Sequence, residues 1–148
     1  MIDSSGTKVE KSERYSSASG FVQTALFDEN GITIGDNFPM ISGEGLVIYL
    51  KEDMDIKLSQ NNCPDLIFKT GINWIGTPCQ SVNSSVFTLL NAIGNESFIS
   101  SIQHYNTYTG KFETAGYLNG QPAGVNFPIK AGEGYFIYMK KDMTGFKP

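Results

Sequence analysis

Residues 35–54 read GDNFPMISGEGLVIYLKEDM, and residues 124–143 read GVNFPIKAGEGYFIYMKKDM. The two stretches align without a gap at an offset of 89 residues and are identical at 12 of 20 positions. A repeat this close predicts that the same substructure forms twice. In each copy an extended Asn-Phe-Pro approach leads into a Gly-Glu-Gly turn and then a short strand. The unbroken apolar runs LVIYL and YFIYM predict strands that are buried on both faces.

The two Gly-Glu-Gly triplets are predicted to be structural turns. They comprise Gly43, Glu44 and Gly45 in the first copy and Gly132, Glu133 and Gly134 in the second. A pair of carboxylates can flank a glycosidic bond as acid and base. Equivalent residues of a repeat need not approach each other, however, so we expect each glutamate to accept hydrogen bonds from the amides of its own turn and predict no catalytic residue.

Three hairpins are predicted, two in the second half of the chain and one before the first copy of the repeat. Residues 66–68 and 72–75 are strand-like runs separated by Thr70-Gly71, which favours a hairpin. Residues 98–105 and 111–117 predict another hairpin, whose turn ends at a glycine. A shorter hairpin, 22–27 with 32–34, precedes the first copy of the repeat.

One helix is predicted, at residues 84–93. Apolar residues recur there at i, i+3, i+4 and i+7, which is the period of an amphipathic helix. Asn83 or Ser84 can cap its start, and Gly94 stands where a helix ends. The expected fold class is therefore α+β and mostly antiparallel, with one short helix.

The repeat predicts two related β-rich units that form one compact domain. Residues 21–56 form a partial unit and residues 57–148 a full one, and we expect them to share a core because three or four strands cover themselves poorly. Residues 1–20 are polar and have almost no apolar anchors, so they are predicted to be a flexible tail. An added edge strand around Val9 is the alternative. We expect no signal peptide in these twenty residues.

Charge and hydropathy exclude two classes of partner. The chain has 11 Lys and Arg against 15 Asp and Glu, which gives a net charge of −4, and Arg14 is its one arginine. A nucleic-acid binder normally needs a basic, arginine-bearing face, so nucleic acid is not expected as a partner. No apolar run approaches the length of a membrane span, so none is predicted in this chain.

The two cysteines, Cys63 and Cys79, flank the hairpin predicted around Gly71. A turn centred there places them opposite each other, and the Ser-, Thr- and Asn-rich composition is typical of an exported protein. Together these favour a disulfide over two free thiols. No metal or other cofactor is predicted, because the chain has one histidine, His104, and no cysteine pair at metal-ligand spacing. No G-x-S-x-G elbow is present, so an enzyme is not expected.

Aromatic residues of the longer unit are the candidate ligand contacts. The weak predicted site comprises Tyr105, Tyr108, Tyr117 and Trp74. Exposed aromatic faces stack on sugar rings or form hot spots for a protein partner. Aromatics in strands also pack as cross-strand pairs, and for Trp74 and Phe112 the core is the favoured alternative.

The full unit resembles a repeated module of bacterial secreted and cell-surface proteins. That module has the pattern G-W-N-x-I-S-x-P, then I-W-x-Y-D-x-x-T-G-x-W, then G-E-G-Y-W-I-Y, and this chain reads GINWIGTP at 71–78, IQHYN at 102–106, TGKF at 109–112 and GEGYFIY at 132–138. The resemblance covers 66–140 well and 22–54 in its second half. Ile72, Phe136 and Val47 stand where the pattern has tryptophan, and Gly76-Thr77 replaces its Ser-x step. The resemblance implies a bacterial extracellular or cell-surface location and supplies no catalytic residues.

Taken together, these patterns predict a non-catalytic extracellular module for adhesion, assembly or accessory support of a larger secreted or cell-surface protein. Its expected partners are other domains or surface proteins. A carbohydrate-binding module that uses the exposed aromatics is one alternative. A subunit of a surface fibre or pilus, which would associate with copies of itself, is the other.

Overall fold

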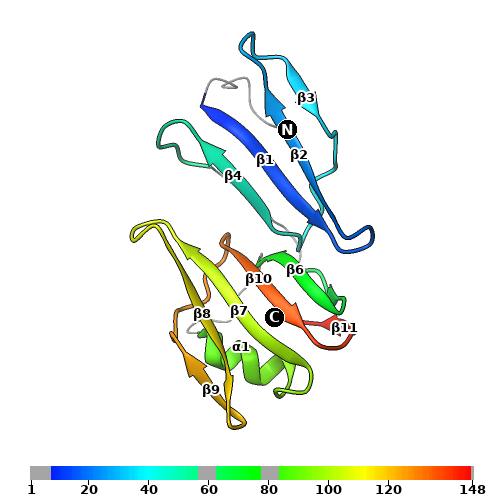
Figure 1. The fold of residues 1–148 in the computed structure, drawn as a ribbon, viewed down its shortest axis with the longest axis vertical. Helices are drawn as coiled ribbons and strands as arrows, with labels where there is room; N and C mark the ends of the chain where they lie inside the picture. Colours follow the sequence, from blue (N-terminus) through cyan, green and yellow to red (C-terminus); the bar gives the residue numbers. More distant parts are fainter. Residues whose placement is uncertain (1–7, 57–62, 78–83, 148) are drawn as a thin grey trace.

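The computed structural model describes residues 8–56, 63–77 and 84–147. The chain is mostly antiparallel β-structure in three sheets with one short helix, as the sequence predicts (Figure 1). The first sheet has the order β3-β2-β1-β4, the second β6-β10-β7-β8-β9, and the third pairs β11 with β5.

The strands have the following bounds. The first sheet contains β1 (Val9–Ser16), β2 (Phe21–Phe27), β3 (Thr33–Gly35) and β4 (Leu46–Leu50). The second contains β6 (Gly71–Gly76), β7 (Ile99–Asn106), β8 (Lys111–Leu118), β9 (Gln121–Gly124) and β10 (Gly134–Met139). The third contains β5 (Leu66–Phe68) and β11 (Met143–Phe146).

The flexible tail predicted for residues 1–20 is wrong over β1. This strand lies inside the first sheet, between β2 and β4, and Ser12 is opposite Ala25 on one side and Ile48 on the other. The alternative interpretation, a strand around Val9, is therefore confirmed as to the strand and wrong as to its place, because β1 is not at an edge of the sheet. Hydrogen bonding to a neighbour on each side holds β1 in place although it has few apolar anchors. Residues 1–7 lie outside the described residues.

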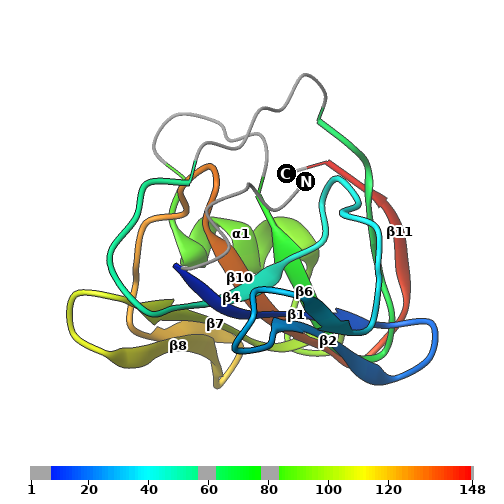
Figure 2. The same cartoon turned by 90° about the horizontal axis from the view of Figure 1, so that it is seen from above.

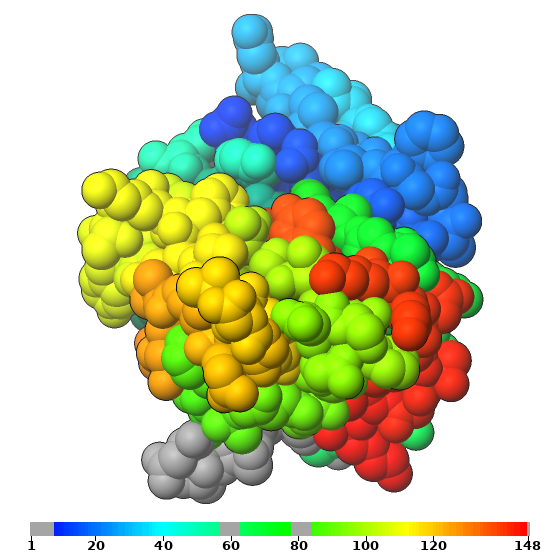
Figure 3. Space-filling model, turned by 60° about the horizontal axis from the view of Figure 1, so that its bottom comes forward, coloured from blue at the N-terminus to red at the C-terminus, as the bar shows by residue number. Residues whose placement is uncertain are grey.

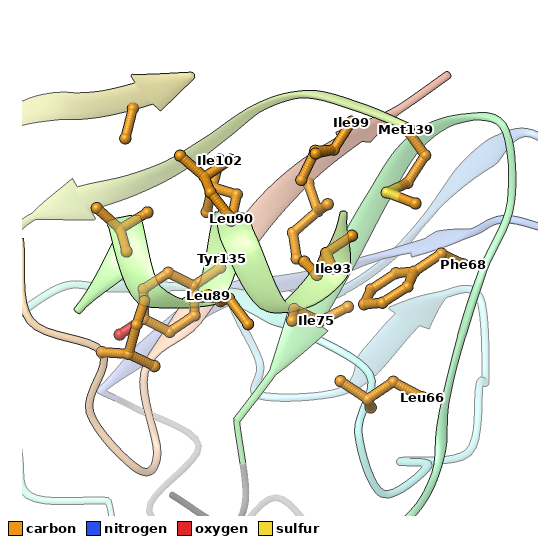
Figure 4. Packing of buried hydrophobic residues seen from close by; sticks show 14 of the residues in the cluster. Leu66, Phe68, Ile75, Leu89, Leu90, Ile93, Ile99, Ile102, Tyr135 and Met139 are labelled. Carbon is orange, nitrogen blue, oxygen red and sulfur yellow. The ribbon is translucent and has the colours of Figure 1, made fainter. Parts of the chain in front are cut away.

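The predicted helix is confirmed as α1 (Val86–Ile93). Its cap is Ser85, one or two residues later than predicted, whose side chain accepts a hydrogen bond from the backbone N–H of Thr88, and Gly94 ends it as predicted. Helix α1 covers one face of the second sheet (Figure 2). Its buried side chains pack against β7 and β10 and against Phe68, as Figure 4 shows for Leu89, Leu90 and Ile93.

The hydrophobic core belongs to the second half of the chain. Every buried residue of the cluster lies between Leu66 and Met139, so among the described residues the cluster does not extend into the first sheet, and a core shared by two units is not confirmed. Burial on both faces is also wrong for both repeat strands. In β10 buried residues alternate with half-buried ones, and β4 has no buried residue.

Two of the three predicted hairpins form. β2 pairs with β3 and β7 pairs with β8, whose turn ends at Gly110 with φ of 66°. The hairpin predicted across Thr70-Gly71 does not form, because β5 pairs with the C-terminal β11 and β6 pairs with β10. The Asn73 side chain closes the chain between β5 and β6 instead, since its amide bonds both the N–H and the C=O of Lys69.

The two Gly-Glu-Gly triplets meet the same end of β6. On one side Gly45 N–H donates to the C=O of Trp74, at 3.0 Å, and Gly76 N–H donates to the C=O of Gly43, at 3.1 Å. On the other side Thr77 N–H donates to the C=O of Glu133, at 3.2 Å. Both triplets are therefore joined to this end of β6 by backbone hydrogen bonds, and the first one connects the first sheet to the second.

Candidate functional site

The face of the second sheet opposite α1 is covered by no described helix or strand, and the first sheet presents its corresponding face in the same direction (Figures 1 and 2). We call this common surface the open face. In the second sheet it is formed by Ile72, Trp74, Ser101, Gln103, Tyr105, Phe112, Thr114, Leu118, Phe136 and Tyr138. In the first sheet it is formed by Lys11, Glu13, Tyr15, Val22, Thr24, Leu26, Ile34, Val47 and Tyr49.

Five aromatic rings form a continuous row across the open face. Each comes from a different strand, and neighbouring ring centroids are 5.1–6.1 Å apart, which is contact distance for aromatic pairs. In order the row is Tyr15, Trp74, Phe136, Phe112 and Tyr105. We call these residues the aromatic row. It crosses from the first sheet to the second where Tyr15 meets Trp74, beside the first Gly-Glu-Gly triplet.

The end of the aromatic row nearest β8 is open to solvent. Phe112 is 58% exposed and Tyr105 is 48% exposed. Neutral polar groups lie beside these rings, since Gln103 donates from Nε2 to Oγ1 of Thr114 at 3.1 Å. The open face of the second sheet carries no charged side chain at its strand positions. The arrangement offers aromatic surface and hydrogen-bonding groups to an uncharged ligand.

The structure brings together two of the four predicted ligand contacts. Tyr105 and Trp74 belong to the aromatic row, and Tyr108 lies in the β7–β8 turn beside its exposed end, 95% exposed. Tyr117 does not lie on the open face with the others. Its ring packs against the core on the α1 side, and its hydroxyl donates to the C=O of Gly94.

Three residues of the row were not predicted as ligand contacts. Phe112 is more than half exposed, so the core alternative fails for it. Phe136 lies directly opposite Trp74 and was visible as an aromatic position of the repeat strand. Tyr15 fell in the segment predicted to be a tail, so no sequence pattern pointed to it.

Each glutamate of the two triplets bonds a side chain rather than the amides of its own turn. Glu44 pairs with Arg14 at 3.1 Å. Glu133 accepts a hydrogen bond from the hydroxyl of Tyr135 at 3.0 Å and lies 4.0 Å from Nδ1 of His104. The expectation of bonds from turn amides is therefore wrong, and the glutamates instead fix strand residues to the turns.

The His104 side chain packs against neighbouring side chains and does not face an open site. Its ring lies 4.4 Å from the ring of Phe127, and its Nε2 is 2.8 Å from Oε2 of Glu113. Hydrogen bonds from His104 and then from Asn106 hold the pKa of Glu113 below its ordinary value. Burial raises the pKa of the Tyr135 hydroxyl well above its ordinary value, so that hydroxyl stays protonated as a donor.

Cys63 is disulfide-bonded. Its predicted partner, Cys79, lies outside the described residues, so the predicted pairing stays a prediction. The spacing argument for it assumed the hairpin at Gly71, which does not form. Among residues 8–56, 63–77 and 84–147, no group of three or more His, Cys, Asp or Glu side chains is placed to hold a metal ion. No helix in the same ranges is long and apolar enough to span a membrane.

Comparison of this chain with protein-family models, with curated proteins and with solved structures finds no match.

Proposed function

We propose that the chain is a non-catalytic extracellular module that binds uncharged glycans through the aromatic row. The observation that carries the proposal is the continuity of five rings on a surface with no charge at its second-sheet strand positions. The C–H faces of sugar rings are apolar and pack on aromatic faces, while the hydroxyls at their rims need neutral donors and acceptors. Phe112 and Tyr105 supply the first, and Gln103 and Thr114 the second.

The absence of charge separates this ligand class from anionic ones. Aromatic rows also stack the bases of single-stranded nucleic acid, but such sites combine the rings with a groove of cations along the phosphates. The open face of the second sheet has no lysine or arginine at its strand positions. A neutral polysaccharide therefore fits better than nucleic acid or an acidic glycan.

The non-catalytic part of the proposal rests on the glutamates and on His104. Each of these groups already has a structural partner, and His104 is packed on the ring of Phe127. The extracellular part rests on the disulfide of Cys63, because disulfides persist in oxidising compartments. It also rests on the resemblance of the sequence to modules of bacterial surface proteins, so attachment to a larger surface protein belongs to the same proposal.

We further propose that the two sheets are related units of a repeat. The strand order β3-β2-β1-β4 recurs in the second sheet as β9-β8-β7-β10. Ile48 and Ile137 occupy the same position of the repeat, and they lie opposite Ser12 and Ile102 in their sheets. These observations support units built on residues 9–50 and 99–139 rather than the predicted 21–56 and 57–148.

The test is binding of the purified chain to cellulose, chitin and starch, followed by a glycan array. Replacement of an exposed ring, Phe112→Ala or Tyr105→Ala, is expected to weaken binding about fivefold or more, if a sugar stacked on one ring contributes about 1–3 kcal/mol, as a stacked base does. The matched control is Leu118→Ala, because Leu118 is exposed on the same face but is not part of the aromatic row. Binding should also change the fluorescence of Trp74, the one tryptophan of the chain.

Two results would overturn the proposal. One is no saturable binding to any of these glycans. The other is equal loss of binding in Phe112→Ala and Leu118→Ala, because it would mean that the rings have no special part in it. Tyr108→Ala extends the site: loss of binding places the ligand over the β7–β8 turn, and unchanged binding confines it to the sheet.

A further inference from the structure

Apart from Tyr15 of the aromatic row, the open face of the first sheet is mostly apolar around a single pair of opposite charges. We call this part the first-sheet patch, and it consists of Lys11, Glu13, Val22, Thr24, Leu26, Ile34, Val47 and Tyr49, with Thr24 as its one neutral aliphatic polar side chain. Lys11 lies between Leu26 and Tyr49 across the strands, and Ile34 follows Leu26. The first sheet forms one end of the molecule, where other chains can reach it (Figure 3).

The first-sheet patch has the composition of a covered surface. The solvated face of an antiparallel sheet normally carries polar side chains. Here Val22 is 47% exposed, Ile34 45% and Tyr49 40%, and they lie on one face of a four-stranded sheet. Contiguous apolar surface of this kind marks an interaction site.

The charges at the centre of the patch are complementary to themselves. Nζ of Lys11 is 2.8 Å from Oε1 of Glu13, two residues along the same strand, and 4.0 Å from the ring centre of Tyr49. A second copy turned by a two-fold axis through this pair brings its Glu13 to Lys11 and its Lys11 to Glu13. The first-sheet patch has no net charge although the chain carries −4, so two copies meet here without net repulsion.

We propose that the first-sheet patch is the interface of a two-fold dimer of this chain. The two first sheets pack face to face at the usual separation of about 10 Å. The apolar side chains form the interior of the interface, and four charges alternate in sign at its centre. The first-sheet patch contains no residue of the aromatic row, whose exposed rings, Phe112 and Tyr105, lie on the second sheet, so the dimer can be tested separately from glycan binding.

The experiment is sedimentation of the chain over a range of concentrations, with charge-reversed variants. The wild type is expected to be dimeric, and Lys11→Glu and Glu13→Lys alone are each expected to weaken the dimer by about a hundredfold or more, because each places like charges opposite each other. An equimolar mixture of these two variants is expected to form a heterodimer, since every facing pair is then opposite in charge.

The controls separate local pairing from net charge and from folding. Lys11→Glu takes the net charge from −4 to −6 and Glu13→Lys takes it to −2, so repulsion between whole molecules cannot explain a loss in both. Lys147→Glu makes the same change as Lys11→Glu on a side chain outside the patch and is expected to leave the dimer intact. If a charge-reversed variant fails to fold, Ile34→Asp on the exposed rim takes its place and is expected to abolish the dimer.

The proposal is overturned if the wild type sediments as a monomer at every concentration. It is also overturned if the mixture of folded variants fails to recover the dimer, or if Lys147→Glu is as damaging as Lys11→Glu.

Discussion

The two sheets share a strand order but are stabilised in different ways. In the second sheet the face toward α1 is lined by fully buried side chains, among them Ile102 and Ile137. At the matching place in the first sheet Ser12 lies opposite Ile48, which is only half-buried. The second sheet therefore depends on apolar burial against a helix, whereas the first depends on backbone pairing and on its junction with β6.

In both sheets a side chain of a central strand, β1 or β7, contacts the Asn-Phe-Pro segment and the Gly-Glu-Gly triplet, but the side chains differ. In the first, the Arg14 guanidinium donates to the C=O of Pro39, pairs with Glu44 and lies over the ring of Phe38. In the second, His104 lies against Phe127 and near Glu133. In both sheets a nitrogen-bearing side chain of a strand lies between the Phe of the Asn-Phe-Pro segment and the Glu of the triplet, so the two copies share an interaction and not only a strand.

The largest expected effect is on stability, and it compares a buried isoleucine of the second sheet with the matching half-buried isoleucine of the first. Ile137→Ala is expected to lower the free energy of unfolding by about 3 kcal/mol, because Ile137 is fully buried and its truncation leaves a cavity. Ile48→Ala, at the matching position, is expected to cost about 1 kcal/mol, because Ile48 is half-buried. Urea unfolding followed by circular dichroism measures both. Equal losses would show that the first sheet has a core of its own.

The next effect tests the junction between the sheets. A Cβ on Gly45 would lie 2.8 Å from the backbone N and O of Ile75, whereas a Cβ on Gly134 would have its nearest neighbours at 3.8 Å. Gly45→Ala is therefore expected to destabilise the protein by about 1–3 kcal/mol. Gly134→Ala, at the matching position, is expected to be close to neutral.

Amide exchange locates the damage. In Gly45→Ala it should rise in β4 and β6, where the two sheets meet, and not in β8. A Gly45→Ala protein as stable as Gly134→Ala would mean that the first triplet does not hold the sheets together.

Elements that depend on neighbouring residues could be predicted from the sequence, whereas those that depend on contacts between distant residues could not. Helix α1 and the β7–β8 hairpin were predicted because their signals, an apolar stripe and a turn glycine, are local. Strand β1 was only the alternative to a flexible tail, because residues 9–16 lack an alternating apolar pattern and are held by pairing with β2 and β4. The pairing of β5 with β11 was missed because the two strands are far apart in sequence and no local signal connects them. The run at 72–75 is nearer to β5 and was therefore predicted as its partner.

The candidate site was predicted in part for a similar reason. Tyr105 and Trp74 were chosen for their residue type, and the strands place both on the open face. Tyr117 was chosen in the same way, but it is five residues from Phe112 in one strand, and an odd separation puts it on the other face. Counting along the strand could have excluded it. The contact of Tyr15 with Trp74 depends on how the sheets meet, and no pattern in the sequence describes that.

The smallest expected effect concerns acid stability and again compares matching positions. Asp142 accepts hydrogen bonds from the backbone N–H and the hydroxyl of Thr70, which lower its pKa to about 2, while the matching Asp53 makes no such bond to a described residue. A lowered carboxylate pKa gives stability that is complete above the unfolded pKa, near 4, and is lost as the pH falls through about 2.

Asp142→Asn should therefore unfold at a lower urea concentration than the wild type at pH 6, and the difference in urea midpoint should close between pH 4 and pH 2. Asp53→Asn should match the wild type throughout, so a gap for Asp142→Asn that persists at pH 2 would assign the effect to lost packing rather than to the charge.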